Sequence, residues 1–298
     1  MERKSVLDGT AVILMVLLCA LWGFQQVTIK VANTALPPFL QCGMRSAIAM
    51  PLVGLWAWAR GVRLTTADGS LWPGLLAGLL FATEFSMIYW GLTYTTAARS
   101  VLLIYTAPFV IAVGVHFLLP GEILGRWQVG GLVCAFLGVV IALADNLSMP
   151  AGNQWIGDLL AFGAALLWGA TTLVIRTTCL ARIAATKTLL YQLGVSAVAL
   201  PLVSWLIGEQ LRGEMTPLVW AAFAYQAVVV AFVTYLAWFW LIISYPPARL
   251  SAFSFLTPLF GMLFGALLLG ETITFRLMVA MFLVSMGLWM VNRKPAGG

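Results

Sequence analysis

The feature that most constrains this chain is a succession of long apolar runs that fill almost its whole length. A helix needs about 20 apolar residues to cross the hydrocarbon core of a membrane, and the chain offers one such run after another. Only 9% of its 298 residues are charged and 62% are hydrophobic, whereas soluble domains are about a quarter charged. The alternating patterns of a membrane β-barrel are absent. We therefore expect an all-α integral membrane protein.

Glycine and proline residues separate the apolar runs and divide the chain into ten expected transmembrane helices. The first run follows a short basic segment, as a signal peptide does, but it is long enough to span and no typical cleavage site follows it. We therefore keep it as a helix. The expected helices cover about 10–31, 38–59, 70–92, 96–119, 125–144, 156–178, 187–207, 217–242, 248–269 and 274–291.

Two stretches of the chain, 90–108 and 240–258, repeat one pattern. Each contains an apolar run, a short turn that ends in Ala-Arg, and a second apolar run with a proline in its middle. The matching pairs are Trp90 with Trp240, Arg99 with Arg249, and Pro108 with Pro258. We predict two copies of one five-helix unit, in residues 1–150 and 151–298.

An odd number of helices per copy predicts that the second copy is inverted in the membrane, as in many secondary transporters. If the N-terminus is cytoplasmic, that side carries eleven Lys and Arg residues near the loops and the other side three, as the positive-inside rule requires. We expect two inverted repeats around a central cavity in a bacterial-type inner membrane, with both termini cytoplasmic. The net charge of +6 then belongs to cytoplasmic loops, and we expect no nucleic-acid partner.

Two charged side chains are expected well inside the membrane. Arg45 and Glu84 each lie about eight residues from the outer ends of their helices, which corresponds to about 12 Å of depth. A charge at that depth is costly unless it is paired or faces water. One interpretation is a structural ion pair of Glu84 with Arg45 or Lys30. The other is that Arg45 or Glu84 contacts a zwitterionic substrate or carries a coupling proton.

Two tryptophans, Trp22 and Trp168, occupy matching positions in the leading helix of each half, too deep for interfacial anchors. They either pack in the core or form an aromatic wall of a cavity. Polar and aromatic residues elsewhere in the helices need partners in hydrocarbon, which a wet cavity would supply. The further cavity candidates are Gln26, Gln41, Tyr89, Tyr191, Gln192, Tyr225, Tyr235 and Trp238.

Pro108 and Pro258 lie near the middle of their expected helices. A proline there removes a backbone hydrogen bond and kinks the helix. Such a kink is either static, since membrane helices tolerate proline, or one of a symmetric pair of hinges.

The sequence offers little that could carry out catalysis. Its one histidine, His116, has no partner motif, and its four cysteines lack metal-ligand or disulfide spacing. Phosphate-binding glycine loops and common hydrolase motifs are absent. We expect no enzyme, no metal and no cofactor, so transport would depend on a gradient of substrate or ion.

The chain resembles the drug/metabolite transporter superfamily, and within it the EamA-type transporters, which include exporters of aromatic amino acids. The resemblance rests on the ten helices, the paired Trp-Gly motifs, and the Ala-Arg turn before each proline-bearing helix. It implies a central cavity ringed by four helices of each half, peripheral fifth and tenth helices, and alternating access. The positions that match are Trp22, Gly23, Lys30, Arg45, Arg99, Pro108, Glu122, Trp168, Gly169, Arg176, Arg249, Pro258 and Glu271.

The sequence therefore predicts a carrier that exports amino acids, aromatic or otherwise apolar, and similar metabolites across the lipid bilayer. A carrier of lipophilic cations is the alternative from the same class, and Arg45 beside the one deep acid argues against it. An intramembrane enzyme and a non-transporting sensor are the alternatives from other classes. A monomer is compatible with all of these hypotheses.

Overall fold

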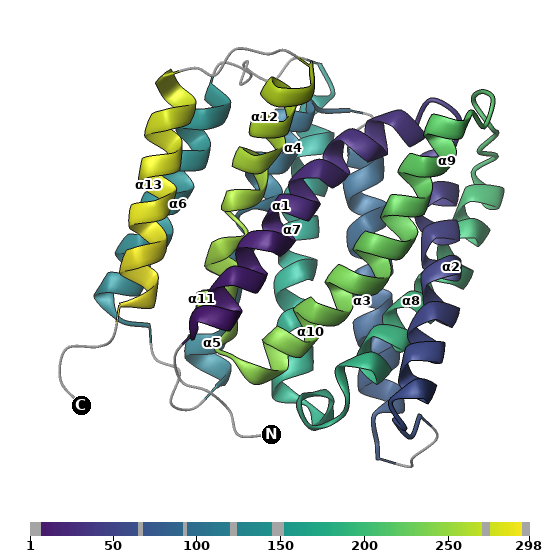
Figure 1. The fold of residues 1–298 in the computed structure, drawn as a ribbon, viewed down its shortest axis with the longest axis horizontal. Coiled ribbons are helices and arrows are strands. Elements are labelled where there is room, and N and C mark those ends of the chain that lie inside the picture. Colours follow the sequence, from purple (N-terminus) through teal and green to yellow (C-terminus); the bar gives the residue numbers. More distant parts are fainter. Residues whose placement is uncertain are drawn as a thin grey trace.

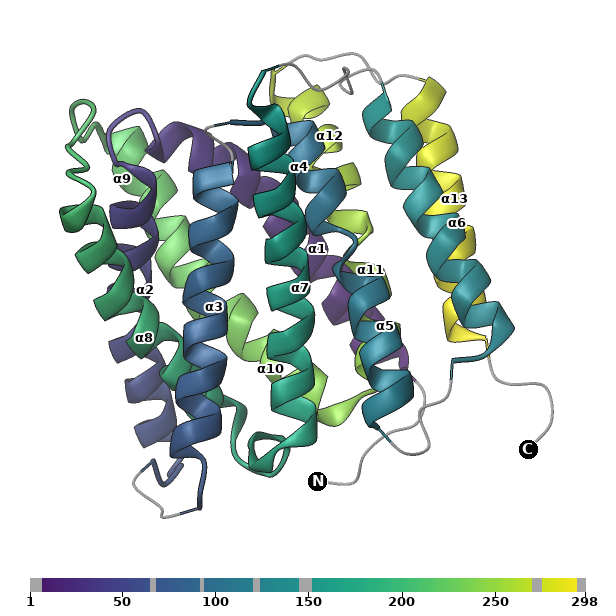
Figure 2. The same cartoon turned by 180° about the vertical axis from the view of Figure 1, so that it is seen from behind.

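The computed structural model describes residues 7–64, 68–91, 94–119, 124–144, 152–269 and 275–293. Every regular element in these ranges is helical, and the helices form one bundle (Figures 1 and 2). The elements in chain order are α1 (Gly9–Ala32), α2 (Pro38–Ala59), α3 (Leu71–Gly91), α4 (Ala97–Ile104), α5 (Ala107–Leu118), α6 (Arg126–Leu143), α7 (Gln154–Thr177), the 3₁₀ helix η2 (Cys179–Arg182), α8 (Ala185–Leu206), α9 (Pro217–Ala224), the π-helix η3 (Tyr225–Thr234), α10 (Tyr235–Ser244), α11 (Pro247–Phe253), α12 (Leu256–Leu269) and α13 (Phe275–Asn292).

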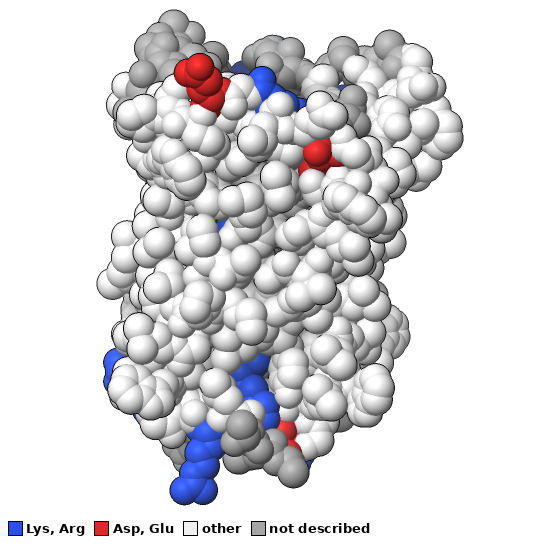
Figure 3. All heavy atoms as spheres, turned by 90° about the vertical axis from the view of Figure 1, so that its right-hand side faces the viewer, with Lys and Arg blue, Asp and Glu red and all other residues white. Residues whose placement is uncertain are grey.

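The surface of the bundle is suited to hydrocarbon. Eight segments are long and apolar enough to cross a membrane, with α4–α5 and α9–η3–α10 each forming one of them. Of the remaining helices, α2 packs on α8, while α11 and α12 pack on α5 and α1. In Figure 3, basic side chains gather toward the lower end of the visible face, and the surface between the two ends is almost free of charge. The protein is a multi-pass membrane protein.

Helices α6 and α13, which correspond to the expected helices over 125–144 and 274–291, pack together at one side of the bundle (Figures 1 and 2). Their close contact depends on two glycines. A methyl group on Gly287 would lie 2.5 Å from the carbonyl oxygen of Gly131, and a methyl group on Gly131 would lie 2.5 Å from that of Gly287. Small residues at such crossings let the backbones approach and gain van der Waals contact.

The helices that carry Pro108 and Pro258 are broken, whereas α2 and α8 stay continuous through Pro51 and Pro201. α4 ends at Ile104 and α5 begins at Ala107, one residue before Pro108, while α11 ends at Phe253 and α12 begins at Leu256, two residues before Pro258. Proline lacks an amide hydrogen and its ring collides with the preceding turn, which favours a break at both positions without by itself requiring one. A third irregularity is the π-helix η3, which the sequence pattern does not indicate. Helices of this kind are rare and frequent at functional sites.

Ion pairs tie the helices at both ends of the bundle. Arg99 of α4 makes an ion pair with Asp158 near the start of α7, and Asp158 also accepts a hydrogen bond of 2.7 Å from Thr95. This end, uppermost in Figure 1, is called the Asp158 end. At the opposite end, Lys187 Nζ of α8 lies 2.8 Å from a carboxylate oxygen of Asp68, and this is called the Lys187 end.

The α6–α13 contact generates a stability prediction. Gly287→Ala should destabilise the protein by about 1–3 kcal/mol, because the new methyl group overpacks the crossing. A lower melting temperature of the detergent-solubilised protein would show it. Gly54→Ala in α2 is the matched control, because open space surrounds Gly54 and alanine favours a helix interior. Equal melting temperatures for the two variants would contradict the proposed role of the glycine crossing.

Candidate functional site

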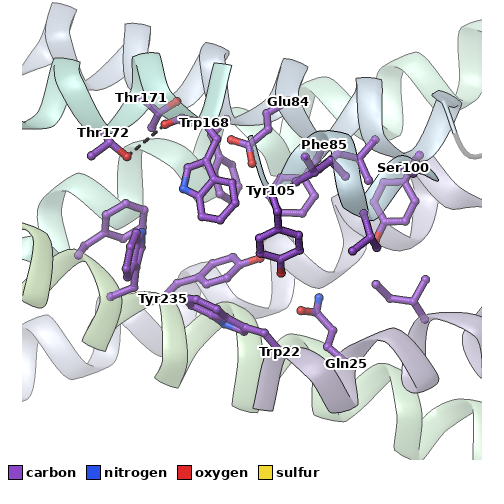
Figure 4. A pocket seen from close by; sticks show the side chains of 18 of the residues that line it. Trp22, Gln25, Glu84, Phe85, Ser100, Tyr105, Trp168, Thr171, Thr172 and Tyr235 are labelled. Carbon is purple, nitrogen blue, oxygen red and sulfur yellow. Dashed lines mark hydrogen bonds between the residues drawn. The ribbon is translucent and has the colours of Figure 1, made fainter. Parts of the chain in front are cut away.

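A cavity of about 390 Å³ lies inside the bundle between α1, α3, α4, α7 and α10 (Figure 4). Its walls are largely apolar and aromatic with a few polar groups, which is typical of small-molecule sites. The lining residues that the sequence analysis singled out by their type and depth are Trp22, Glu84, Tyr89, Trp168, Tyr235 and Trp238. The other lining residues are Gln25, Ile29, Asn33, Phe81, Phe85, Ile88, Ser100, Val101, Ile104, Tyr105, Thr171, Thr172 and Phe239.

Aromatic rings from both halves of the chain meet edge to face around the cavity. The rings of Trp22 and Trp238 lie 5.6 Å apart at 79°, and those of Tyr105 and Trp168 lie 6.1 Å apart at 76°. This geometry is the preferred one for aromatic pairs, because the positive edge of one ring meets the negative face of the other. The rings therefore hold each other in place and form a wall of fixed shape.

A hydrogen-bond chain orients the indole ring of Trp22. Its Nε1 donates to the hydroxyl of Thr234 at 2.9 Å, and that hydroxyl donates to the carbonyl oxygen of Val230 at 2.7 Å. Both partners belong to the π-helix η3. The irregular helix thus fixes one wall of the cavity.

Glu84 is the ionisable acid that lines the cavity. Its side chain enters the cavity from α3 (Figure 4). Glu84 is 8% exposed and makes no ion pair or hydrogen bond through its side chain within the described part of the chain. An unpaired carboxylate in an apolar site attracts a cationic group, because little water competes for its charge.

Arg45 lies behind the cavity wall rather than in it. Its guanidinium carbon lies 4.6 Å from the ring centre of Phe85 and 5.7 Å from that of Tyr235, and both rings line the cavity. The side chain is fully buried, and its Nη2 donates to the sulfur of Cys42 at 3.4 Å. Arg45 and Glu84 do not form the ion pair that one interpretation of the sequence favours. The side chain of Lys30 lies outside the described residues.

Neutral hydrogen-bonding groups line the part of the cavity nearer the Asp158 end. They come from Asn33 at the end of α1, Tyr89 near the end of α3, and Ser100 in α4. The hydroxyl oxygens of Tyr89 and Ser100 are buried and have no hydrogen-bond partner within the described part of the chain. These hydroxyl groups can donate to an anionic group of a ligand without adding a charge to the cavity.

Two of the predicted cavity residues instead join helices outside the cavity. Gln41 Nε2 donates to Gln226 Oε1 at 2.9 Å, which links α2 to η3. The hydroxyl of Tyr225 donates to the carbonyl oxygen of Leu21 at 2.9 Å, which links η3 to α1. Both contacts satisfy polar groups that hydrocarbon would otherwise leave unpaired.

Two further candidates lie on α8, away from the cavity. Tyr191 packs on Gly74 of α3, and its hydroxyl lies 3.0 Å from the Ser70 hydroxyl. Gln192 is completely buried, and its two amide atoms have no partner. The side chain of Gln26 lies outside the described residues.

The sequence reasoning missed several lining residues, among them Asn33, Phe85 and Ser100. A usable signal existed on α1, where Trp22, Gln25, Ile29 and Asn33 follow one another at helical spacing on one face. The same signal is weak on α4, because that helix is short and the residues beside it are apolar.

Two segments of the chain, residues 9–144 and 155–293, match the model of one family, the EamA-like transporter family. The chain belongs to the EamA-like transporter family. Membership explains why an apolar bundle encloses a cavity with a few polar groups, because a carrier must hold its substrate inside the membrane.

Relatives of this EamA-like transporter cover nearly its whole length. It is 27% identical over 308 residues to the "Probable amino-acid metabolite efflux pump" of Salmonella typhimurium, across 97% of this chain and 95% of that protein. It is 24% identical over 272 residues to the "Uncharacterized transporter YoaV" of Bacillus subtilis, across 91% and 92%. A crystal structure superposes with a TM-score of 0.83 at 20% identity over 95% of this chain and 96% of that chain, which establishes the fold.

The cavity of this EamA-like transporter extends from the middle of the bundle toward the Asp158 end. The lining residues of α1 and α3 come from the second half of each helix, and α4 begins at that end. On the other side of the cavity, Arg176 Nη1 of α7 donates to the carbonyl oxygen of Ile242 at 3.0 Å. This contact joins α7 to α10 between the cavity and the Lys187 end.

The position of the cavity predicts which buried serine meets solvent. In a variant with alanine at the four native cysteines, Ser100→Cys should react with a small water-soluble methanethiosulfonate reagent at least about tenfold faster than Ser251→Cys, because thiol reactivity depends on access. Both serines are almost fully buried, but Ser100 lines the cavity and Ser251 packs within α11 against Ala248. Equal labelling rates by mass spectrometry would show that the cavity does not reach solvent.

Proposed function

We propose that this EamA-like transporter is a secondary carrier that exports amino acids with aromatic or apolar side chains, and related amine-bearing metabolites. The observation that carries the proposal is the unpaired Glu84 carboxylate inside an aromatic cavity. A substrate ammonium group would bind Glu84, and its apolar side chain would pack on the rings of Trp22, Trp168 and Trp238. An ammonium group near aromatic faces also gains from cation–π attraction.

The polar groups nearer the Asp158 end supply a place for the substrate carboxylate. The unpartnered hydroxyl groups of Tyr89 and Ser100 can donate hydrogen bonds to it, together with the amide of Asn33. Because these donors are neutral, they would bind the carboxylate without the high desolvation cost of a second charge. Glu84 and these neutral donors would then bind the ammonium and the carboxylate group that an amino acid carries on its α-carbon.

Alternating access in this proposal comes from two inverted halves, residues 1–150 and 151–298, with ten membrane crossings in all. The breaks before Pro108 and Pro258 support symmetric hinges, because each leaves backbone positions free to bend. The hydrogen bond between Arg176 and the carbonyl oxygen of Ile242 would break when the cavity opens toward the Lys187 end. The basic residues near that end support a cytoplasmic location for it and for both termini.

Export of lipophilic cations is a second candidate function, and one observation favours it. Arg45 lies behind Phe85 and Tyr235, so Glu84 is the charged side chain that the described cavity presents to a ligand. A cavity with one carboxylate and many aromatic rings fits a cation that has no carboxylate of its own. The two candidates therefore differ in whether the substrate needs an anionic group.

A binding comparison tests the role of Glu84. Glu84→Gln should weaken equilibrium binding of radiolabelled tryptophan and of tryptamine to the purified protein by about tenfold or more, since a hydrogen bond to a charged group contributes about 1.5–3 kcal/mol. Glu214→Gln in an exposed loop should leave both affinities unchanged. Unchanged binding in Glu84→Gln would remove the basis of the proposal.

The same two ligands separate the two candidate functions. Uptake into proteoliposomes of tryptophan and tryptamine, with and without a pH gradient, measures transport directly. Transport of both ligands, or of tryptophan alone, supports the amino-acid carrier. Transport of tryptamine alone would favour the carrier of lipophilic cations.

A further inference from the structure

Helix α8 carries a row of buried polar side chains that the cavity does not use. Thr188, Gln192 and Ser196 are each 0% exposed, and their polar side-chain atoms have no hydrogen-bond partner among the residues that the structure describes. Spacing of four residues places them on one face of the helix. An unsatisfied buried polar group is costly and is normally paired or bound to ordered water. Three such residues in one row make chance packing a poor explanation.

The position of the row follows from its neighbours on α8. Tyr191 and Val195 pack on two glycines of α3, whereas Leu189 and Leu193 belong to the apolar core shared with α2, α3 and α10. The row lies between these two sides of α8. It therefore points into the interior of the bundle, along the boundary between α3 and the core.

The row begins beside the ion pair at the Lys187 end and leads toward Arg45. Thr188 directly follows Lys187, which binds Asp68. Antiparallel packing of α2 on α8 places Gly43 against Pro201 and Met50 near Gly194, so along the bundle axis the backbone of Arg45 lies about one helical turn beyond Ser196, with its side chain on another face of α2 than Gly43. The Nε and Nη1 atoms of the buried Arg45 also have no partner.

We propose that this row binds a chain of water molecules that runs from the Lys187–Asp68 pair to the Arg45 guanidinium. Successive side chains in the row are about 6 Å apart along the helix axis, which one water molecule spans with two hydrogen bonds of about 2.8 Å. The water chain satisfies the hydroxyl and amide groups of Thr188, Gln192 and Ser196. It also hydrates Arg45, whose charge has no carboxylate in contact within the described residues.

The water chain and the cavity approach the middle of the bundle from opposite ends. The rings of Phe85 and Tyr235 contact Arg45 on one side and line the cavity on the other. These two rings are therefore the barrier between the water chain and the cavity. A proton or a small ion that enters at the Lys187 end would reach this barrier without crossing apolar core.

Paired cysteine variants test the proposal without any knowledge of the substrate. With the four native cysteines replaced by alanine, Ser196→Cys is compared with Leu193→Cys, and Thr188→Cys with Leu189→Cys. All four positions are 0% exposed. The row positions should react with a small water-soluble methanethiosulfonate reagent at least about tenfold faster than their leucine partners, because water gives the reagent access.

A further substitution, combined with each row cysteine, tests the direction of the water chain. Gln192→Leu places an apolar side chain between Thr188 and Ser196. It should slow labelling of Cys at position 196 and leave labelling at position 188 unchanged. Gel filtration confirms that each variant is folded.

Two results would overturn the proposal. Row cysteines that react as slowly as their leucine partners, in both pairs, would show that the row is dry. If Gln192→Leu leaves the labelling rate at position 196 unchanged, water does not arrive from the Lys187 end. Neither result depends on the amino-acid export proposed above, which is tested by Glu84 and ligand binding.

Discussion

Two opposite charges at similar depth in the membrane are held apart by aromatic rings. The Arg45 guanidinium rests on Phe85 and Tyr235, while the Glu84 carboxylate points into the cavity on their other side. If the two charges formed a contact ion pair, each would satisfy the other and the cavity would be neutral. Because they are separated, the carboxyl group of Glu84 stays available to a cationic group in the cavity, and the guanidinium of Arg45 has no carboxylate in contact within the described residues.

The rings themselves depend on irregular backbone. Thr234 in the π-helix η3 accepts the hydrogen bond that orients Trp22, and the same segment leads into α10, which supplies Tyr235 and Trp238. The breaks before Pro108 and Pro258 interrupt two further helices next to the bundle centre. Elsewhere the helices are regular and pack through glycines, as at Gly131 and Gly287. Regular packing thus forms the frame, and irregular segments lie around the cavity.

The sequence pattern predicted part of the cavity lining, because it identified side chains that lie deep within an apolar run. Trp22, Trp168 and Glu84 stood out because large or charged side chains are unusual near the centre of an apolar run. Gln41, Tyr191 and Tyr225 stood out for the same reason, yet they bind neighbouring helices. Depth in a run does not reveal the direction in which a side chain points. Apolar residues dominate most of the helices, and a row of polar residues such as that on α8 does not by itself show that it faces the cavity.

The amino-acid sequence by itself determined the class of the protein and the approximate limits of its helices. Each apolar run needs only its own length and composition to span hydrocarbon, so that property is local. The tertiary structure decided that Arg45 lies outside the cavity, that Arg99 pairs with Asp158, and that the α8 row is buried without partners. These outcomes depend on which helices pack together and on how each one is rotated about its axis, and residues far apart in the chain set both.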